Sequence, residues 1–151
     1  HHRSSAASDV YKRQDGDLDI ITVDIYSNNL YVGNHPQTQI GFTGRYQINK
    51  TLDIGGQYLY NAKLYSDYDV SDRDDKNLAN AQPFQMDNYG VLDLRIGARF
   101  KLGNIGAYAQ VQGYNMLDEI YWARGVEDSG SLGEGFPSWG RTLNFSLKLN
   151  F

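Results

Sequence analysis

The last residues of the chain, Arg141 to Phe151, read R-T-L-N-F-S-L-K-L-N-F. From Leu143 onward every odd position holds a large apolar residue, and every even position holds a polar one. A period of two places the two kinds of side chain on opposite faces of a β-strand. About 9–11 residues of tilted strand also cross the hydrocarbon core of a bilayer. The stretch therefore predicts a strand of the kind found in membrane β-barrels.

A single strand of this type does not exclude a soluble β-sandwich, whose strands also have one apolar and one polar face. The length of 151 residues favours one domain, and the composition, with 12 Tyr and 16 Gly, favours β structure. Mean hydropathy is −0.57, too low for a transmembrane helix. Membrane barrels have such values because their alternating strands average to a polar composition.

Charge and cysteine content exclude several functions. The net charge of −4 and the pI of about 5.2 argue against nucleic acid as a partner, which would require a basic surface. The absence of cysteine excludes disulfides, thiol catalysis and thiolate metal sites.

Residues 1–14 (HHRSSAASDVYKRQ) have neither an initiator Met nor the apolar segment of a secretory signal. We expect this tract to be non-native or disordered, and residues 15–151 to be a piece of a longer protein.

The order of strands and connections gives a topology. Alternation predicts strands at residues 18–26, 38–48, 51–65, 89–100, 105–114 and 141–151. Tight turns fall at 49–50 and 101–104, and long polar loops at 27–37, 66–88 and 117–138. Short periplasmic turns and long extracellular loops are typical of bacterial outer-membrane barrels. With the carboxyl terminus in the periplasm, both tight turns lie there and all the long loops lie outside.

The two faces of the predicted strands fit the same arrangement. Charged side chains in mid-strand lie opposite the apolar face, where a barrel has its hydrated lumen: Arg45, Lys63, Arg95, Arg99 and Lys148. By parity, Trp139 lies on the apolar face at the outer end of the last strand, the position of an aromatic girdle.

Two segments resemble the carboxyl-terminal end of TonB-dependent outer-membrane receptors. They are G-Y-N-M-L-D-E-I-Y-W at Gly113–Trp122 and G-F-P-S-W-G-R-T-L-N-F-S-L-K-L-N-F at Gly135–Phe151. In that family a strand ends in an Asn-hydrophobic-Phe/Leu-Asp/Asn motif and an aromatic pair follows. Here the motif is Asn115, Met116, Leu117 and Asp118, followed by Tyr121 and Trp122. A Pro/Gly-Arg element before the last strand is matched by Pro137, Gly140 and Arg141.

The resemblance implies an all-β, antiparallel transmembrane barrel of about 22 strands with a plugged lumen, of which this chain holds about six carboxyl-terminal strands. It implies active uptake of a scarce nutrient such as a siderophore, cobalamin or a glycan across the bacterial outer membrane, energised by TonB. Partners would be outer-membrane lipid, the small-molecule or glycan ligand, and the TonB complex, reached through an amino-terminal plug part that has no counterpart here. The barrel-assembly machinery would read the apolar residues of the last strand: Leu143, Phe145, Leu147, Leu149 and Phe151.

The sequence gives little support for catalysis, metal binding or a cofactor, and we expect none. The loop carboxylates Asp67, Asp69, Asp72, Asp74 and Asp75 lack the glycine of a calcium-binding loop. Outside residues 1–14 the only His is His35, and no Ser lies in a G-x-S-x-G elbow. Two alternatives remain: another outer-membrane β-barrel, either a porin or a barrel enzyme, and a soluble β-sandwich binding module.

Overall fold

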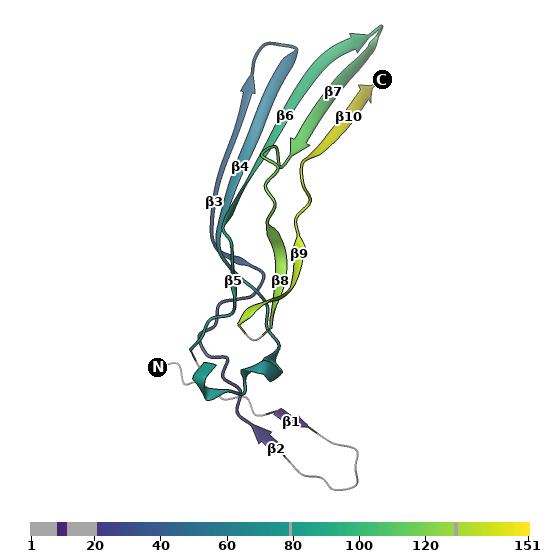
Figure 1. The fold of residues 1–151 in the computed structure, drawn as a ribbon. Coiled ribbons are helices and arrows are strands. Elements are labelled where there is room, and N and C mark those ends of the chain that lie inside the picture. The colour runs from purple at the N-terminus through teal and green to yellow at the C-terminus, as the bar shows by residue number, and fades with distance from the viewer. Residues whose placement is uncertain (1–8, 12–20, 79, 129) are drawn as a thin grey trace, which may run out of the picture.

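A computed structural model describes residues 9–11, 21–78, 80–128 and 130–151 (Figure 1). Its main element is an antiparallel sheet with the strand order β10-β7-β6-β4-β3. The strands are β3 (Pro36–Gln47), β4 (Leu52–Tyr65), β6 (Tyr89–Leu102), β7 (Ile105–Tyr114) and β10 (Thr142–Asn150). Short β5 (Gln85–Met86) pairs with the end of β4. The expectation of an all-β antiparallel fold is confirmed.

The two predicted hairpins and the last strand form as expected. β3 pairs with β4 across the 48–51 turn, and β6 pairs with β7 across a turn in which Gly103 has a φ of 61°. A glycine at the first central position of a two-residue hairpin loop allows this positive φ without steric cost. The sheet is open, because in the described part of the chain β3 and β10 each pair along one edge only.

The strand predicted at residues 18–26 is only partly present. Residues 18–20 lie outside the described residues, and the strand that follows is β2 (Ile21–Val23). It pairs with β1 (Asp9–Tyr11) in a separate two-stranded sheet and does not join the main sheet. The adjacent Ile20 and Ile21 interrupt the alternation that would give this segment one apolar face. The rest of the 1–14 tract lies outside the described residues.

Two of the long loops contain regular structure that the sequence did not predict. Residues 66–88 contain the short 3-10 helices η1 (Val70–Arg73) and η2 (Lys76–Leu78), in addition to β5. Most of residues 117–138 fold into a hairpin of β8 (Trp122–Asp128) and β9 (Ser131–Pro137). Two register irregularities and four glycines conceal the alternation in this hairpin.

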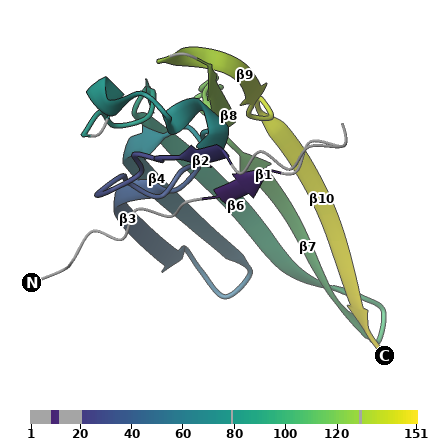
Figure 2. The same cartoon turned by 90° about the horizontal axis from the view of Figure 1, so that it is seen from below.

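The apolar residues of the main sheet form continuous rows across all five strands. One row runs Tyr46, Ile54, Ile96, Val111 and Phe145, each directly opposite the next. The exposed fractions of these residues are 66%, 38%, 58%, 49% and 67%. The register thus assembles the predicted apolar face and leaves it uncovered, as the single layer of strands in Figure 2 shows.

The adjacent row contains three glycines. It runs Gly44, Gly56, Leu94, Gly113 and Leu143. A shallow apolar trough of about 520 Å³ lies over its Gly44–Leu94 part and is also lined by Ile54 and Ile96.

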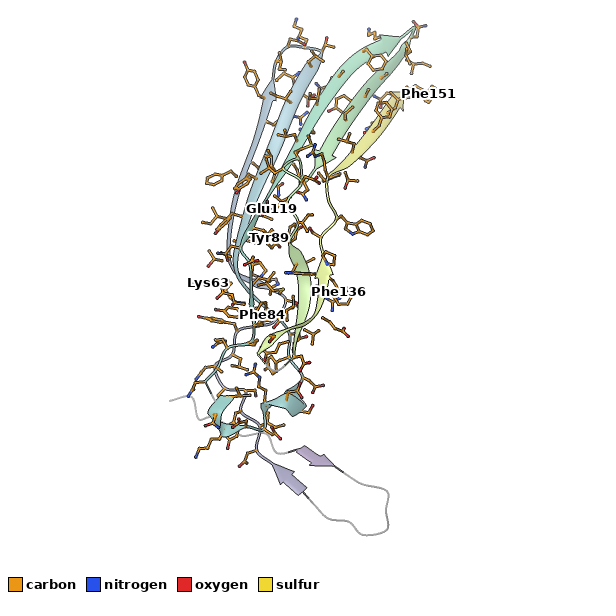
Figure 3. The ribbon with its side chains drawn as sticks, in the orientation of Figure 1. Lys63, Phe84, Tyr89, Glu119, Phe136 and Phe151 are labelled. Atoms are coloured by element: carbon orange, nitrogen blue, oxygen red, sulfur yellow. The ribbon has the colours of Figure 1, made fainter. Side chains whose placement is uncertain are left out.

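The long loops gather at the end of the sheet opposite the tight turns and the carboxyl terminus (Figure 1). A buried ion pair holds them together: Arg73, 2% exposed, donates to Oε1 of Glu127 at 2.6 Å, and Glu127 Oε2 accepts from the backbone N–H of Phe84. Leu64, which the alternation along β4 assigns to the apolar face, is buried at this loop end, and so is Met86 of β5; each is 2% exposed. In Figure 3 Phe84 marks this loop end and Phe151 marks the opposite end.

Candidate functional site

The 117–138 segment folds over the polar face of the sheet. Tyr121, which precedes β8, stacks on Tyr89 with ring centroids 3.6 Å apart and planes 7° apart. Tyr89 belongs to the polar face, because the register places it opposite Asn61, which in turn lies opposite Gln39. Burial raises the pKa of the Tyr121 hydroxyl, and the nearby Asp93 carboxylate raises it further.

Two hollows lie between the polar face and this segment. The larger, about 580 Å³, is lined by Asp93 of the sheet, by Tyr121 and Phe136 of the segment, and by Trp139, which follows the segment and precedes β10. The smaller, about 240 Å³, is lined by amide side chains of β3 and β4 and by the two stacked tyrosines. Figure 3 labels Tyr89 of the smaller hollow and Phe136 of the larger one. The loop end of the polar face is therefore partly enclosed.

Nearer the tight turns, three arginines surround one buried carboxylate. Asp53 is 0% exposed. Its Oδ1 accepts from Arg45 at 3.2 Å and its Oδ2 from Arg99 at 3.1 Å, while Arg95 lies 3.9 Å from Oδ1. The hydroxyl of Tyr108 approaches the same carboxylate at 3.4 Å. A buried carboxylate needs such charged and hydrogen-bonding partners to offset its loss of hydration.

A glycine makes this burial possible in a single-layer sheet. Gly97 lies directly opposite Asp53, and a Cβ built on Gly97 would collide with the Tyr108 hydroxyl. The ring of Tyr108 thus occupies the position where Gly97 has no side chain, an arrangement known from aromatic rescue of glycine in sheets. Arg99 stacks on the Tyr108 ring, with its guanidinium carbon 5.2 Å from the ring centroid.

The sequence placed Arg45, Arg95 and Arg99 on the polar face but did not single out Asp53. The 48–51 turn fixes the β3–β4 register and so predicts that Arg45 and Asp53 fall in adjacent rows. The arginines of β6 come beside Asp53 through the β4–β6 register, which spans the 66–88 loop and which neither tight turn fixes.

Two residues of the predicted motif, Asn115 and Asp118, connect the two segments that resemble the receptor family. Asn115 is 5% exposed, has a φ of 49°, and donates from Nδ2 to the backbone carbonyls of Glu119 and Trp139 at 2.8 and 3.2 Å. Its Oδ1 accepts from the Glu119 N–H, and its own N–H donates to Asp93. Asp118, with a φ of 57°, accepts the Arg141 N–H.

The remaining motif residues have separate positions. Met116 donates its N–H to the Leu92 carbonyl and covers Gly113, and Leu117 is 57% exposed. Pro137 pairs with Trp122 at the end of β9, and Gly140 lies against Asp118, where a Cβ would be 3.1 Å from Oδ1. The motif thus closes the β7 strand and sets the start of β10.

The apolar side chains of the last strand are exposed. Leu143, Phe145, Leu147 and Leu149 are between 40% and 69% exposed, and Phe151 is 99% exposed. Trp139 is 91% exposed, while its backbone carbonyl is held by Asn115.

The loop aspartates serve as hydrogen-bond acceptors for local backbone. Asp69 caps η1 and accepts from the N–H and the hydroxyl of Ser71, and both bonds lower the pKa of its carboxyl. Asp75 accepts from the N–H of Asn77 in the same way. Within the described residues no group of three or more His, Cys, Asp or Glu side chains is placed to hold a metal ion.

Comparison of the chain with protein-family models, with curated proteins and with solved structures gives no match. In the same described residues, none of the helices has the length and apolar character needed to cross a membrane.

Proposed function

We propose that this chain is the carboxyl-terminal barrel part of a TonB-dependent outer-membrane receptor that takes up a scarce nutrient such as a siderophore, cobalamin or a glycan. One observation carries the membrane part of the proposal: the 117–138 segment covers the loop end of the polar face, while the apolar face is bare except near Leu64 at its loop end. In a soluble β-sandwich the opposite is required, since the apolar faces pack against each other and the polar faces meet water.

The bare face is large and continuous. Apolar patches on soluble monomers rarely exceed a few hundred Å², whereas here apolar residues from all five strands are exposed on one face. Lipid is the solvent in which such a face is stable, and a hydrated lumen suits the opposite face with Asp53 and its arginines.

The edges of the sheet and the motif residues support a larger barrel. β3 and β10 have unpaired edges in the described residues, and a closed barrel removes such edges by adding strands. The contacts of Asn115 and Asp118 give the receptor-like motif a defined role at the β7–β10 junction. Under this proposal the last strand, ending at Phe151, is the segment that the assembly machinery recognises.

A porin or a barrel enzyme shares the lipid-facing sheet but not the plug. The coding sequence upstream of Asp15 distinguishes the receptor from these two alternatives. We expect the extended reading frame to encode a plug of roughly a hundred residues and further alternating strands. A frame with few additional strands and no plug would contradict the receptor and favour a small barrel.

The lipid-facing assignment has its own test in β10. We expect Phe145→Arg to reduce the stability of the chain folded in lipid bilayers by about 2–4 kcal/mol, the cost of a charge near the bilayer midplane. Ser146→Arg is the matched control, because it places the same charge one residue along on the polar face. Urea unfolding of both variants gives the comparison. Equal losses, or a larger loss for Ser146→Arg, would show that Phe145 does not face lipid.

A further inference from the structure

We propose that the hollow between Arg45 and Arg95 on the polar face binds a small oxyanion group of the carboxylate or phosphate class. This inference rests on the sheet itself and is separate from the proposed import function. The hollow adjoins the two hollows under the loop segment, with which it shares Asp93, and lies on their side toward the tight turns.

The hollow exists because a glycine separates the two arginines. Arg45, Gly55 and Arg95 are consecutive members of one cross-strand row. Gly55 has no side chain, and Arg95 extends across it, since a Cβ at Gly55 would be 2.7 Å from Arg95 Nε. The space that remains between the two arginines is about 340 Å³, within the usual range for small-ligand sites.

Hydrogen-bond donors line this space from several strands. Thr43 and Gln57 contribute from β3 and β4, and Gln112 from β7, beside the two guanidinium groups. A guanidinium has five N–H donors in a planar fork that matches the geometry of a carboxylate or a phosphate.

Of the three arginines, Arg95 has the largest unused capacity to donate hydrogen bonds. Its ion pair with Asp53, at 3.9 Å, is the longest of the three, and its side chain makes no hydrogen bond within the part of the chain that the structure describes. Its side chain is 28% exposed and so is accessible from the hollow. By contrast, Arg45 and Arg99 each hydrogen-bond Asp53.

The local charge also favours an anion. The charged residues that line the hollow are Arg45, Arg95 and Asp93, which leaves one positive charge in excess. Asp53 lies outside this lining, and Arg99, also outside it, shares the charge of Asp53. Asp93 lines the hollow and opposes an anion, but one of its oxygens already accepts the Asn115 N–H. An oxyanion would supply the balancing charge and the acceptors that Arg95 lacks.

The test uses the 151-residue chain folded in detergent micelles and ¹⁵N-labelled at its arginines. Inorganic phosphate, acetate and chloride are titrated separately at constant ionic strength, which holds screening fixed. We expect phosphate, and more weakly acetate, to give saturable shifts of the Arg95 and Arg45 Nε–H resonances, and chloride to give none. The Arg45 resonance is the readout in the variants that lack Arg95.

Three variants sharpen the test. Arg95→Gln should weaken phosphate binding roughly tenfold or more, because it removes a charged, bidentate donor. Arg95→Lys keeps the charge but not the fork and should lose several-fold, which covers the case in which Arg95→Gln fails to fold. Lys148→Gln removes one positive charge from the same face outside the hollow and should bind within about twofold of the wild type.

The proposal fails if chloride shifts the Arg95 resonance as much as phosphate does, or if the phosphate response stays linear without saturation. It also fails if Arg95→Lys and Lys148→Gln lose equal affinity, which would indicate only a general attraction of the face for anions. None of these three results bears on the lipid-facing assignment, which depends on Phe145 and the opposite face.

Discussion

The backbone N–H of Arg141 donates to Oδ1 of Asp118 at 2.7 Å, across 23 residues of chain. Asp118 closes the turn after β7 by donating its own N–H to Asn115, and Arg141 immediately precedes β10. The guanidinium of Arg141 also lies 3.9 Å from Asp118 Oδ2. The hairpin formed by β8 and β9 is thereby closed at its base, so the last strand starts at a fixed position beside β7.

We predict that Asp118→Ala loosens this base while Asp118→Asn largely preserves it. Alanine loses the acceptor, at a cost of about 1 kcal/mol, and fits poorly at the φ of 57°. Asparagine keeps an acceptor oxygen and tolerates that conformation. Hydrogen exchange of the Arg141 amide measures the effect, and we expect it to be roughly tenfold faster in Asp118→Ala. Unchanged exchange would show that the bond does not hold the strand.

The contact between Gly97 and Tyr108 gives a second prediction. Gly97→Ala places a methyl group where the Tyr108 hydroxyl lies, and we expect a loss of about 1–3 kcal/mol from overpacking. The control is Gly44→Ala, because nothing lies within 4 Å of a Cβ at Gly44. The two variants are compared by urea unfolding in micelles. If Tyr108 only rests on the surface, Gly97→Ala and Gly44→Ala will have the same unfolding midpoint.

Lys63 has a φ of 54° near the end of β4, a left-handed conformation that is unfavourable for lysine. Its N–H is satisfied by Oδ1 of Asn88. We expect Lys63→Gly to raise the unfolding free energy by roughly 0.5–1 kcal/mol, since glycine adopts this conformation without strain. Lys101→Gly, at an exposed position of β6 without a positive φ, should lower it by a similar amount. A loss in both variants would contradict the assignment of strain to Lys63.

The cap at Asp69 predicts a dependence on pH. Hydrogen bonds from Ser71 lower the pKa of the Asp69 carboxyl in the folded chain. The contribution of the cap to stability is therefore present above the ordinary pKa of an aspartate and is lost as the pH falls through the lowered value. We expect the Ser71 amide resonance to titrate in this acidic range. Asp69→Asn should abolish that titration, and Asp72→Asn in the same turn should leave it in place.

The strands of the main sheet follow from the sequence because their alternation is regular over most of their length, with Leu59 and Val91 as exceptions on the polar face. A shift of one residue in the pairing of β10 would turn every apolar side chain of this strand to the polar face. The alternation of apolar and polar residues therefore selects the register that the structure has. The two hairpin turns, with Asn49-Lys50 and Gly103-Asn104, are short enough to fix which strands are neighbours.

The loop structure does not follow in the same way, because its stabilising contacts are long-range. Arg73 and Glu127 are 54 residues apart, and neither lies in a local pattern that predicts the pair. β8 and β9 contain irregular pairings, so their side chains do not alternate. At the polar face, the convergence on Asp53 depends on two registers at once, and residue parity alone gives only the face.

The three glycines of the row through Gly44, Gly56 and Gly113 differ in how far the backbone is covered. A Cβ at Gly56 would be 2.9 Å from Leu94 Cδ2, and one at Gly113 would meet the Met116 side chain, so neighbouring side chains occupy both positions. Nothing lies within 4 Å of a Cβ at Gly44. Of these three positions, Gly44 is therefore the one at which another molecule can reach the peptide backbone from the apolar side.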